Sequence, residues 1–185
     1  MIFTETPLSG AYVLDLEKRE DDRGFFARTW CRREFEAHGL KTDLAQANDS
    51  FNHHKGTLRG MHMQRAPQAE TKLVRCITGA IYDVIVDMRP DSPTYLGWYG
   101  VELSAENRRQ LYVPEGFAHG YQTLTEGAEV TYQVTEFYTP GAEQGYRWDD
   151  PAFRIVWPLP VRVISEKDAR WPLLEQEGRF DDSRR

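Results

Sequence analysis

Cysteine is scarce in this chain: only Cys31 and Cys76 occur in 185 residues. Two cysteines exclude a disulfide framework and are typical of proteins from a reducing compartment. Long apolar runs are also lacking, because no stretch approaches the roughly 20 apolar residues of a membrane-spanning helix. The first residues carry neither the basic nor the apolar segment of a signal peptide. We therefore expect a cytoplasmic protein that does not enter a membrane.

An excess of basic residues is missing too. The chain has 23 Lys and Arg against 29 Asp and Glu, which gives a formal net charge of −6 at pH 7. This balance argues against nucleic acid as a partner, although it leaves room for a local basic pocket. Because repeats, low-complexity tracts and linkers are absent, we predict a single domain over residues 1–174 and a polar C-terminal tail over 175–185.

Helical signals are few. Residues Arg33–His38, followed by Gly39 as a C-cap, could form two turns. A further short turn could lie in Glu166–Leu174, before or after Pro172.

Strand-forming stretches fill the middle of the chain, with Gly and Pro turn signals between them. These stretches are rich in Val, Ile, Tyr and Leu, and they cover Leu73–Ile77, Ala80–Met88, Gly97–Leu103, Arg109–Val113 and Glu129–Phe137. Such spacing predicts a sandwich or barrel of antiparallel strands, and hence an all-β fold with a few short helices.

Two of these stretches alternate clearly between residue types. In the second, Val84 and Val86 alternate with Asp83, Ile85 and Asp87, which predicts a half-buried strand. In the last, one face carries Val130, Tyr132 and Val134, whereas the other face carries Thr131, Gln133 and Thr135. We expect the face with Tyr132 to point inward.

The segment Gly56–Gln64 is the most informative part of the sequence. It places a cation, Arg59, three residues before a titratable base, His62. In a regular strand these two side chains would point to opposite sides. Gly60 permits a bulge that turns one of them into a common cavity. A base and an anion-binding cation in one cavity indicate proton transfer on a negatively charged substrate; the alternative is a half-buried structural histidine beside a surface arginine.

A second histidine, His119, follows a turn formed by Pro114 and Gly116. With His62 it gives two histidines on what we expect to be neighbouring strands, as in metal-binding barrels of the cupin type. Those barrels also use a histidine two positions after the first one, where this chain has Gln64, a poor ligand for a transition metal. We therefore predict no metal site.

Other polar residues have simple surface interpretations. Lys72 enters a predicted strand, but a lysine there is ordinarily solvated, and the same holds for Arg23. Glu143 lies in a loop region and would by default be solvated. Asp168 is flanked by basic residues, and its alternative role is a surface ion pair of small energetic value.

Taken together, several segments in order from about residue 20 to 174 resemble the dTDP-4-dehydrorhamnose 3,5-epimerase family. The segments include Asp22-Arg23-Gly24-x-Phe26, Gln46-x-Asn48-x-Ser50, Gly56-x-Leu58-Arg59-Gly60-x-His62-x-Gln64, Lys72-Leu73-Val74, Pro114-x-Gly116-Phe117-Ala118-His119-Gly120, Trp148-x-Asp150-Pro151 and Ser165-x-Lys167-Asp168. Independent motifs in register are far more specific than any one alone.

The resemblance implies a homodimeric cupin-type (jelly-roll) antiparallel β-barrel without metal or other cofactor. Its substrate would be a nucleotide-diphosphate 4-keto-6-deoxy sugar, epimerised at C3, C5 or both. By the same resemblance His62 is the base, oriented by Asp168, while Lys72 stabilises the enolate and Tyr132 returns a proton from the opposite face. Further residues match substrate-binding positions of the family: Arg23, Phe26, Gln46, Asn48, Arg59, His119, Tyr138, Glu143 and Lys167.

Two positions depart from the family pattern. Arg28 stands where the family usually has a substrate-contacting glutamate, and Met63 stands where it usually has an aromatic residue. A carboxylate can accept from the N3–H of thymine, whereas an arginine can only donate. One hypothesis is therefore that Arg28 contacts a nucleotide other than dTDP, such as a CDP or GDP sugar. The alternative is that Arg28 points to solvent.

Three rival functions remain open at this point. A monoepimerase would invert C3 or C5 alone, on a different nucleotide sugar such as a CDP or GDP sugar. A metal-dependent cupin enzyme such as a dioxygenase is disfavoured by Gln64. A non-catalytic sugar-nucleotide binding protein would not need the base and the opposed acid, His62 and Tyr132.

Overall fold

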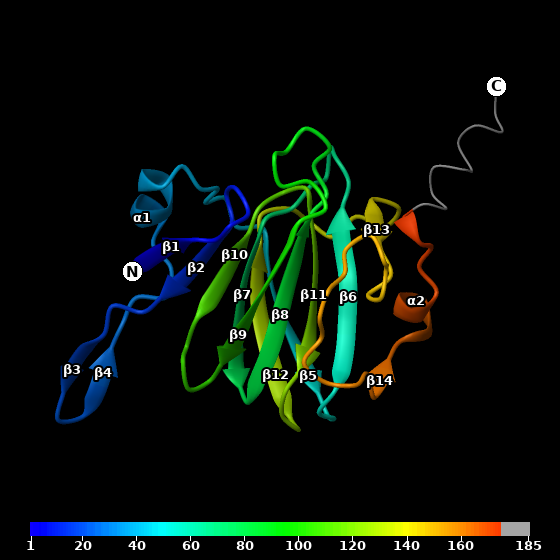
Figure 1. Ribbon diagram of the computed structural model, residues 1–185. Helices are drawn as coiled ribbons and strands as arrows, with labels where there is room; N and C mark the ends of the chain where they lie inside the picture. Colours follow the sequence, from blue (N-terminus) through cyan, green and yellow to red (C-terminus); the bar gives the residue numbers. More distant parts are fainter. Residues whose placement is uncertain (175–185) are drawn as a thin grey trace.

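Two antiparallel sheets face each other in the computed structural model, which describes residues 1–174 (Figure 1). This is the expected all-β, cupin-type jelly roll. The predicted tail over 175–185 lies outside the described residues.

The first sheet has six strands in the order β1-β2-β10-β7-β12-β5. Their bounds are β1 Ile2–Glu5, β2 Tyr12–Asp15, β10 Gln110–Val113, β7 Lys72–Thr78, β12 Ala128–Val134 and β5 Gln46–Asn52. Every pairing in this sheet is antiparallel. Strands distant in sequence thus become neighbours, and β10 and β7 lie at the centre.

The second sheet follows the order β13-β6-β11-β8-β9, with β14 paired in parallel to β6. Its strands are β13 Glu143–Gly145, β6 Thr57–Gln64, β11 Phe117–Thr123, β8 Ala80–Asp87, β9 Trp98–Ser104 and β14 Val163–Ile164. In β6 and β11, His62 and His119 are register partners, so the two histidines do lie on neighbouring strands.

The main core lies between the two sheets. Val74, Leu111 and Val130 of the first sheet pack there against Ile81 and Ile85 of the second. Tyr132 packs partly buried against this cluster, which confirms that its face of β12 points inward. The sheets therefore form a rigid frame around one internal face.

Strand β8 differs from the half-buried strand that its alternation predicts. Both of its faces are buried, because residues of the segment that follows β13 cover the outer side of the sheet. There Val84 and Val86 pack with Tyr146 and Phe153 in a second apolar cluster. Alternation of residue types alone does not show that a further layer covers a strand.

The two short helices form where they were expected. Helix α1 spans Arg32–Ala37, and the chain leaves it through Gly39, whose φ of 69° suits a glycine after a helix end. Helix α2 spans Glu166–Ala169, before Pro172, and its N-cap Ser165 accepts a hydrogen bond from the Asp168 amide. Neither helix has the length or apolar character needed to cross a membrane.

A separate hairpin projects from the body of the molecule. It consists of β3 (Arg19–Asp21) and β4 (Gly24–Phe26), which pair only with each other (Figure 1). All six residues of the two strands are exposed, and the Phe26 residue is 70% exposed. An aromatic side chain on a projecting arm suggests a surface that another molecule covers.

The end of β8 is fixed by a buried carboxylate, Asp87. Its oxygens accept hydrogen bonds from the Arg89 guanidinium at 2.8 Å and from the hydroxyls of Ser92 and Thr94. Burial by itself raises the pKa of Asp87, but these hydrogen bonds outweigh it and lower the pKa from its usual value of 3.8 to about 2. The network ties the β8–β9 loop to the sheet.

We predict that Asp87 contributes about 2 kcal/mol of pH-dependent stability. Because its pKa is lower in the folded state, this contribution is present above about pH 4 and is lost as the pH falls toward 2. In urea denaturation the free energy of unfolding of wild type should exceed that of Asp87→Asn above this range. The difference between the two proteins should narrow as the pH is lowered through it. The matched control is Asp91→Asn, which removes an exposed carboxylate from the same loop. A wild-type advantage that does not change with pH would contradict the prediction.

Candidate active site

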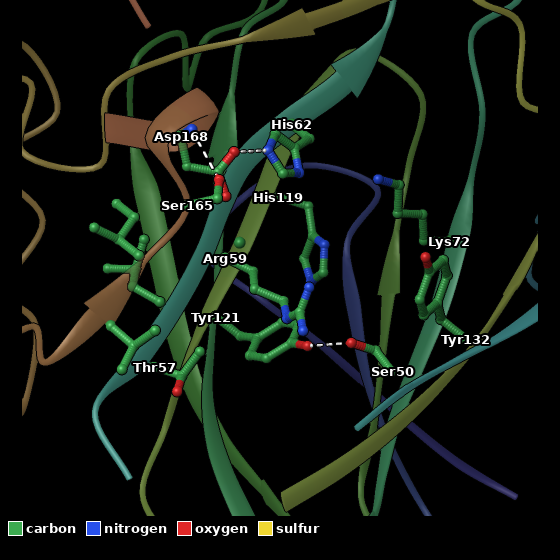
Figure 2. A pocket seen from close by; sticks show the side chains of 14 residues that line it. Ser50, Thr57, Arg59, His62, Lys72, His119, Tyr121, Tyr132, Ser165 and Asp168 are labelled. Atoms are coloured by element: carbon green, nitrogen blue, oxygen red, sulfur yellow. Dashed lines mark hydrogen bonds and ion pairs between the residues drawn. The ribbon is translucent and has the colours of Figure 1, made fainter. Parts of the chain in front are cut away.

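A cavity of about 440 Å³ opens between the sheets on the inner face of β6 and β11. Six of the residues singled out from the sequence line it: Arg59, His62, Lys72, His119, Tyr132 and Asp168. They come from β6, β7, β11, β12 and α2, elements far apart in the chain (Figure 2). The fold therefore gathers the predicted base, cations and acid at one place.

A bend in β6 brings Arg59 and His62 to the same cavity, as the glycine between them predicts. Gly60 has φ of 133°, which L side chains rarely adopt, and the register of β6 against β11 shifts between His119 and Tyr121. A Cβ on Gly60 would lie 2.5 Å from the Gly120 Cα. The two strands approach so closely that only glycine fits there.

His62 is held by Asp168. The imidazole Nε2 lies 2.6 Å from Asp168 Oδ1, and the carboxylate side chain is only 6% exposed. Asp168 Oδ2 also accepts from the Gly60 amide at 3.3 Å. Burial raises the pKa of Asp168, but the hydrogen bond and charge of His62 and the Gly60 and Ser165 bonds lower it overall. An ionised Asp168 accepts a hydrogen bond from Nε2–H and leaves Nδ1 as the free, basic nitrogen on the cavity side (Figure 2).

His119 repeats this arrangement on the neighbouring strand. Its Nε2 lies 2.7 Å from Oδ1 of Asp83, a carboxylate of β8 whose side chain is fully buried. Within residues 1–174, Asp83 Oδ2 has no hydrogen-bond partner. A buried carboxylate with one oxygen unpartnered is costly to maintain, which favours a functional role for the pair.

Lys72 and Tyr132 form the wall across the cavity from His62 (Figure 2). They belong to β7 and β12, which are adjacent in the first sheet. Burial raises the pKa of the Tyr132 phenol, and the nearby Tyr121 and Glu70 add to the effect. Tyr132 therefore keeps its proton and can act as an acid.

Arg59 supplies an anion-binding end to the cavity. Its Nε donates to Asn52 Oδ1 at 2.7 Å, and Nη2 approaches the Phe51 carbonyl at 3.4 Å. Beside it the hydroxyls of Ser50 and Tyr121 lie 2.9 Å apart. Because Asn52 fixes one edge of the guanidinium, the rest of the fork can receive a phosphate.

Five further predicted residues do not line the cavity: Gln46, Asn48, Tyr138, Glu143 and Lys167. Gln46 and Asn48 share a face of β5 with Ser50, and Gln46 Oε1 accepts from the Tyr138 amide at 2.7 Å. Tyr138 itself is 60% exposed. These residues extend the polar wall of the cavity beyond Ser50.

Glu143 and Lys167 form an ion pair at 2.5 Å, and Lys167 also lies over the Trp171 ring. The pair joins β13 to α2, so it steadies the helix that carries Asp168. Asp168 itself is buried and pairs with His62. It does not form the surface ion pair that its basic neighbours in the sequence suggest.

Three predicted residues lie apart from this cavity, on or beside the projecting hairpin. The Arg23 side chain is 90% exposed and pairs with Asp21, and Phe26 is exposed as well. Arg28 donates to Glu34 at 2.7 Å, so its side chain is engaged at the start of α1. None of the three side chains lines the cavity of its own chain. Their roles in substrate binding stay predictions.

Three residues of the site were missed by reasoning from the sequence. Tyr121 was not singled out, although period-2 alternation places it on the same face of β11 as His119. Asp83 and Glu70 were not chosen either, since a lone carboxylate in a strand or loop carries no local signal. Only the folded chain places them against His119 and Lys72.

A metal-binding cluster is not formed within the described part of the chain. No group of three or more His, Cys, Asp or Glu side chains suitable for a metal ion occurs among residues 1–174.

Comparison with known proteins identifies one family. The family model described as dTDP-4-dehydrorhamnose 3,5-epimerase matches residues 5–176. The dTDP-4-dehydrorhamnose 3,5-epimerase of Salmonella typhimurium is 45% identical over 178 residues, covering 95% of this chain and 97% of that protein.

Solved structures agree with this match. The Bacillus anthracis dTDP-4-dehydrorhamnose 3,5-epimerase with TDP and PPi bound superposes with a TM-score of 0.90 at 43% identity, covering 94% of this chain and 99% of the other. The Legionella pneumophila enzyme in complex with dTDP-4-keto-L-rhamnose superposes with a TM-score of 0.87 at 38% identity, covering 94% of this chain and 93% of the other. ChmJ, a 3'-monoepimerase from Streptomyces bikiniensis in complex with dTDP-quinovose, superposes with a TM-score of 0.86 at 30% identity, covering 95% of this chain and 89% of the other.

The close approach of β6 and β11 generates a stability prediction. In Gly120→Ala the new Cβ would lie 2.7 Å from the Arg59 carbonyl oxygen and 2.7 Å from Met61 Sδ, so a backbone shift is unavoidable. We expect a loss of about 2–3 kcal/mol in urea denaturation. Gly141→Ala is the matched control: its φ of 88° is unfavourable for alanine, but no atom lies within 4 Å of the new Cβ. Equal losses in the two variants would show that crowding at Gly120 is not limiting.

Proposed function

Since this chain belongs to the dTDP-4-dehydrorhamnose 3,5-epimerase family, we propose that it inverts C3 and C5 of a dTDP-linked 4-keto-6-deoxy sugar in deoxysugar biosynthesis. The observation that carries the proposal is the cavity itself. A histidine oriented by a buried carboxylate faces a lysine and a tyrosine across it, and an arginine lies at one end. This arrangement fits removal and return of a proton on opposite faces of a sugar.

The substrate chemistry explains why these groups are needed. C3 and C5 both flank the C4 ketone, so loss of either proton leaves an enolate. Such a proton is far too weakly acidic for histidine alone, and the negative charge that grows on the C4 oxygen must be stabilised by a donor already in place.

His62 acts as the base in this proposal. Asp168 accepts a hydrogen bond from Nε2–H, so Nδ1 takes the proton from carbon. The Lys72 ammonium then donates to the C4 oxygen as it becomes an enolate. Tyr132 delivers its phenolic proton to the same carbon from the opposite face, which inverts the centre. His62 then releases its proton to water and the Tyr132 phenolate takes one up from water, which restores the enzyme.

The diphosphate is bound away from the reacting carbons. Arg59 offers the forked donors that suit a phosphate, with Ser50 and Tyr121 beside it. His119, held by Asp83, lies between this end and His62 and provides a further donor to the substrate. Energy gained by binding the diphosphate orients the sugar over His62. Gln46, Asn48, Tyr138, Glu143 and Lys167 extend the binding surface at the mouth.

We also propose a homodimer in which the β3–β4 hairpin of each chain covers the cavity of its partner. The support is the position of the hairpin: Arg23 and Phe26 are exposed on an arm that makes no sheet contact with its own body. Both residues would then contact the nucleotide in the second copy. Phe26 would stack on the base and Arg23 would bind the diphosphate.

The nucleotide we propose is dTDP. The hypothesis of another base rested on Arg28, and Glu34 engages that arginine. The relatives with nucleotides in their names also favour thymidine, because they are complexes with TDP or with dTDP sugars. A cytoplasmic location agrees with the two cysteines, neither of which forms a disulfide.

Monoepimerisation is the second candidate, and the likeness to a 3'-monoepimerase favours it. That protein shares 30% identity with this chain, less than the 3,5-epimerases at 43% and 45%. The two candidate functions differ only in whether one sugar carbon or both C3 and C5 exchange a proton with solvent.

We predict that the enzyme incorporates solvent deuterium at both C3 and C5 of dTDP-4-keto-6-deoxyglucose in D₂O. NMR follows the loss of each proton, with the CDP and GDP sugars as competitors. His62→Asn should slow exchange by about 10³-fold or more at both carbons, because the base is lost. Label at C3 alone would establish a monoepimerase, and faster exchange with a CDP or GDP sugar would overturn the choice of dTDP. Tight binding of a sugar nucleotide without any deuterium exchange would show that the protein is a non-catalytic sugar-nucleotide binding protein.

We predict that two inactive variants restore activity when their subunits are mixed. Arg23→Ala removes the hairpin cation, and His62→Asn removes the base. If the hairpin acts on the partner, a mixed dimer contains one site with both residues intact. Random exchange of subunits should then recover about a quarter of wild-type activity.

Analytical ultracentrifugation supplies the companion measurement for the mixing experiment, since both variants must be dimers. No recovery from mixed dimers would show that the hairpin serves its own chain, and a monomeric wild type would exclude the homodimer.

A further inference from the structure

Glu70 lies against the Lys72 ammonium just behind the cavity wall. Its Oε1 is 3.1 Å from Lys72 Nζ, and the side chains of Glu70 and Lys72 are only 13% and 12% exposed. Glu70 lies in the loop before β7, two positions ahead of Lys72, the first residue of that strand. Glu70 does not line the cavity itself.

The surroundings of Glu70 are rigid. Buried Gln64 donates to the carbonyls of Gln68 and Phe137 at 3.1 and 3.2 Å and accepts from the Thr139 amide at 2.8 Å. It thereby joins the loop that carries Glu70 to the loop that follows β12. Gln64 Nε2 also lies 3.5 Å from Glu70 Oε2, so the same amide group contacts the carboxylate directly.

The charges around the cavity give Glu70 a distinct place. The basic side chains that line the cavity are Arg59 and His62 from β6, Lys72 from β7 and His119 from β11. His62 has Asp168 and His119 has Asp83. Glu70 is the carboxylate that faces Lys72. A nearly buried ammonium without a counter-charge would be unfavourable, and its flexible stem would let it turn away from the cavity.

We propose that Glu70 is a positioning residue for epimerisation: its carboxylate keeps the Lys72 ammonium aimed at the place where the C4 oxygen becomes an enolate. The ammonium has three N–H donors. Its ion pair with Glu70 holds it from behind and leaves N–H donors available to the substrate oxygen. The inference rests on the proposed function.

The test is Glu70→Gln, which keeps the shape of the side chain and removes its charge. Because Lys72 stabilises the enolate, proton removal itself should slow, whichever face receives the new proton. We expect the rates of deuterium exchange and of net inversion to fall together, by about tenfold or more, with KM changed less than twofold. Tyr132→Phe should instead slow inversion more than exchange, since it removes only the opposed acid.

A double-variant cycle separates positioning from a general structural effect. If Glu70 acts through Lys72, Glu70→Gln should add no further loss of exchange in a Lys72→Met background. A loss of the same size in both backgrounds would overturn the inference. Glu102→Gln, which removes an exposed carboxylate of β9, is the matched control and should match wild type.

Folding is checked by thermal unfolding of each variant. If Glu70→Gln does not fold, Glu70→Asp takes its place, because it withdraws the carboxylate by one methylene and should give the same fall in kcat at constant KM. Wild-type exchange in the same assay tests the proposed function independently. Active wild type with an equally active Glu70→Gln would overturn this inference alone, whereas an inactive wild type would overturn both.

Discussion

The close approach of β6 and β11 is the constraint on which the site depends. At Gly60 and Gly120 the two backbones come so near that a Cβ on either residue would overlap the other strand. The resulting bend turns Arg59 and His62 toward one cavity, and it directs the Gly60 amide to Asp168. A regular strand would have separated the base from the anion-binding cation by the width of the sheet.

Each working side chain of the cavity is held by a second residue behind it. His62 has Asp168, His119 has Asp83, Lys72 has Glu70 and Arg59 has Asn52. Such pairs fix orientation before substrate arrives, so little reorganisation is needed when charge develops on the C4 oxygen. Their stabilising effect on the fold is small by comparison, because the free-energy cost of desolvating the charged groups offsets much of their mutual attraction.

Stability comes from elsewhere in the molecule. The apolar cluster between the sheets and the second cluster outside β8 hold the strands in place, while the Asp87 network fixes the β8–β9 loop. The cavity lies between the two sheets, and most of its polar side chains are carried on strands, with Asp168 on α2. This division lets costly polar pairs be maintained at a site where they serve the reaction.

The sequence by itself determined the central strands β7, β8, β9, β10 and β12, both short helices, the inward face of Tyr132 and the family, because these follow from local periodicity and from motifs in order. It also indicated the bend at Gly60. Only the tertiary structure decided that β8 is buried on both faces and that the hairpin with Arg23 and Phe26 stands apart from its own cavity. The same is true of Asp83 and Glu70 as partners of His119 and Lys72. Asp83 lies 36 residues from its partner in sequence, and Glu70 lies in an irregular loop, so neither contact leaves a local pattern.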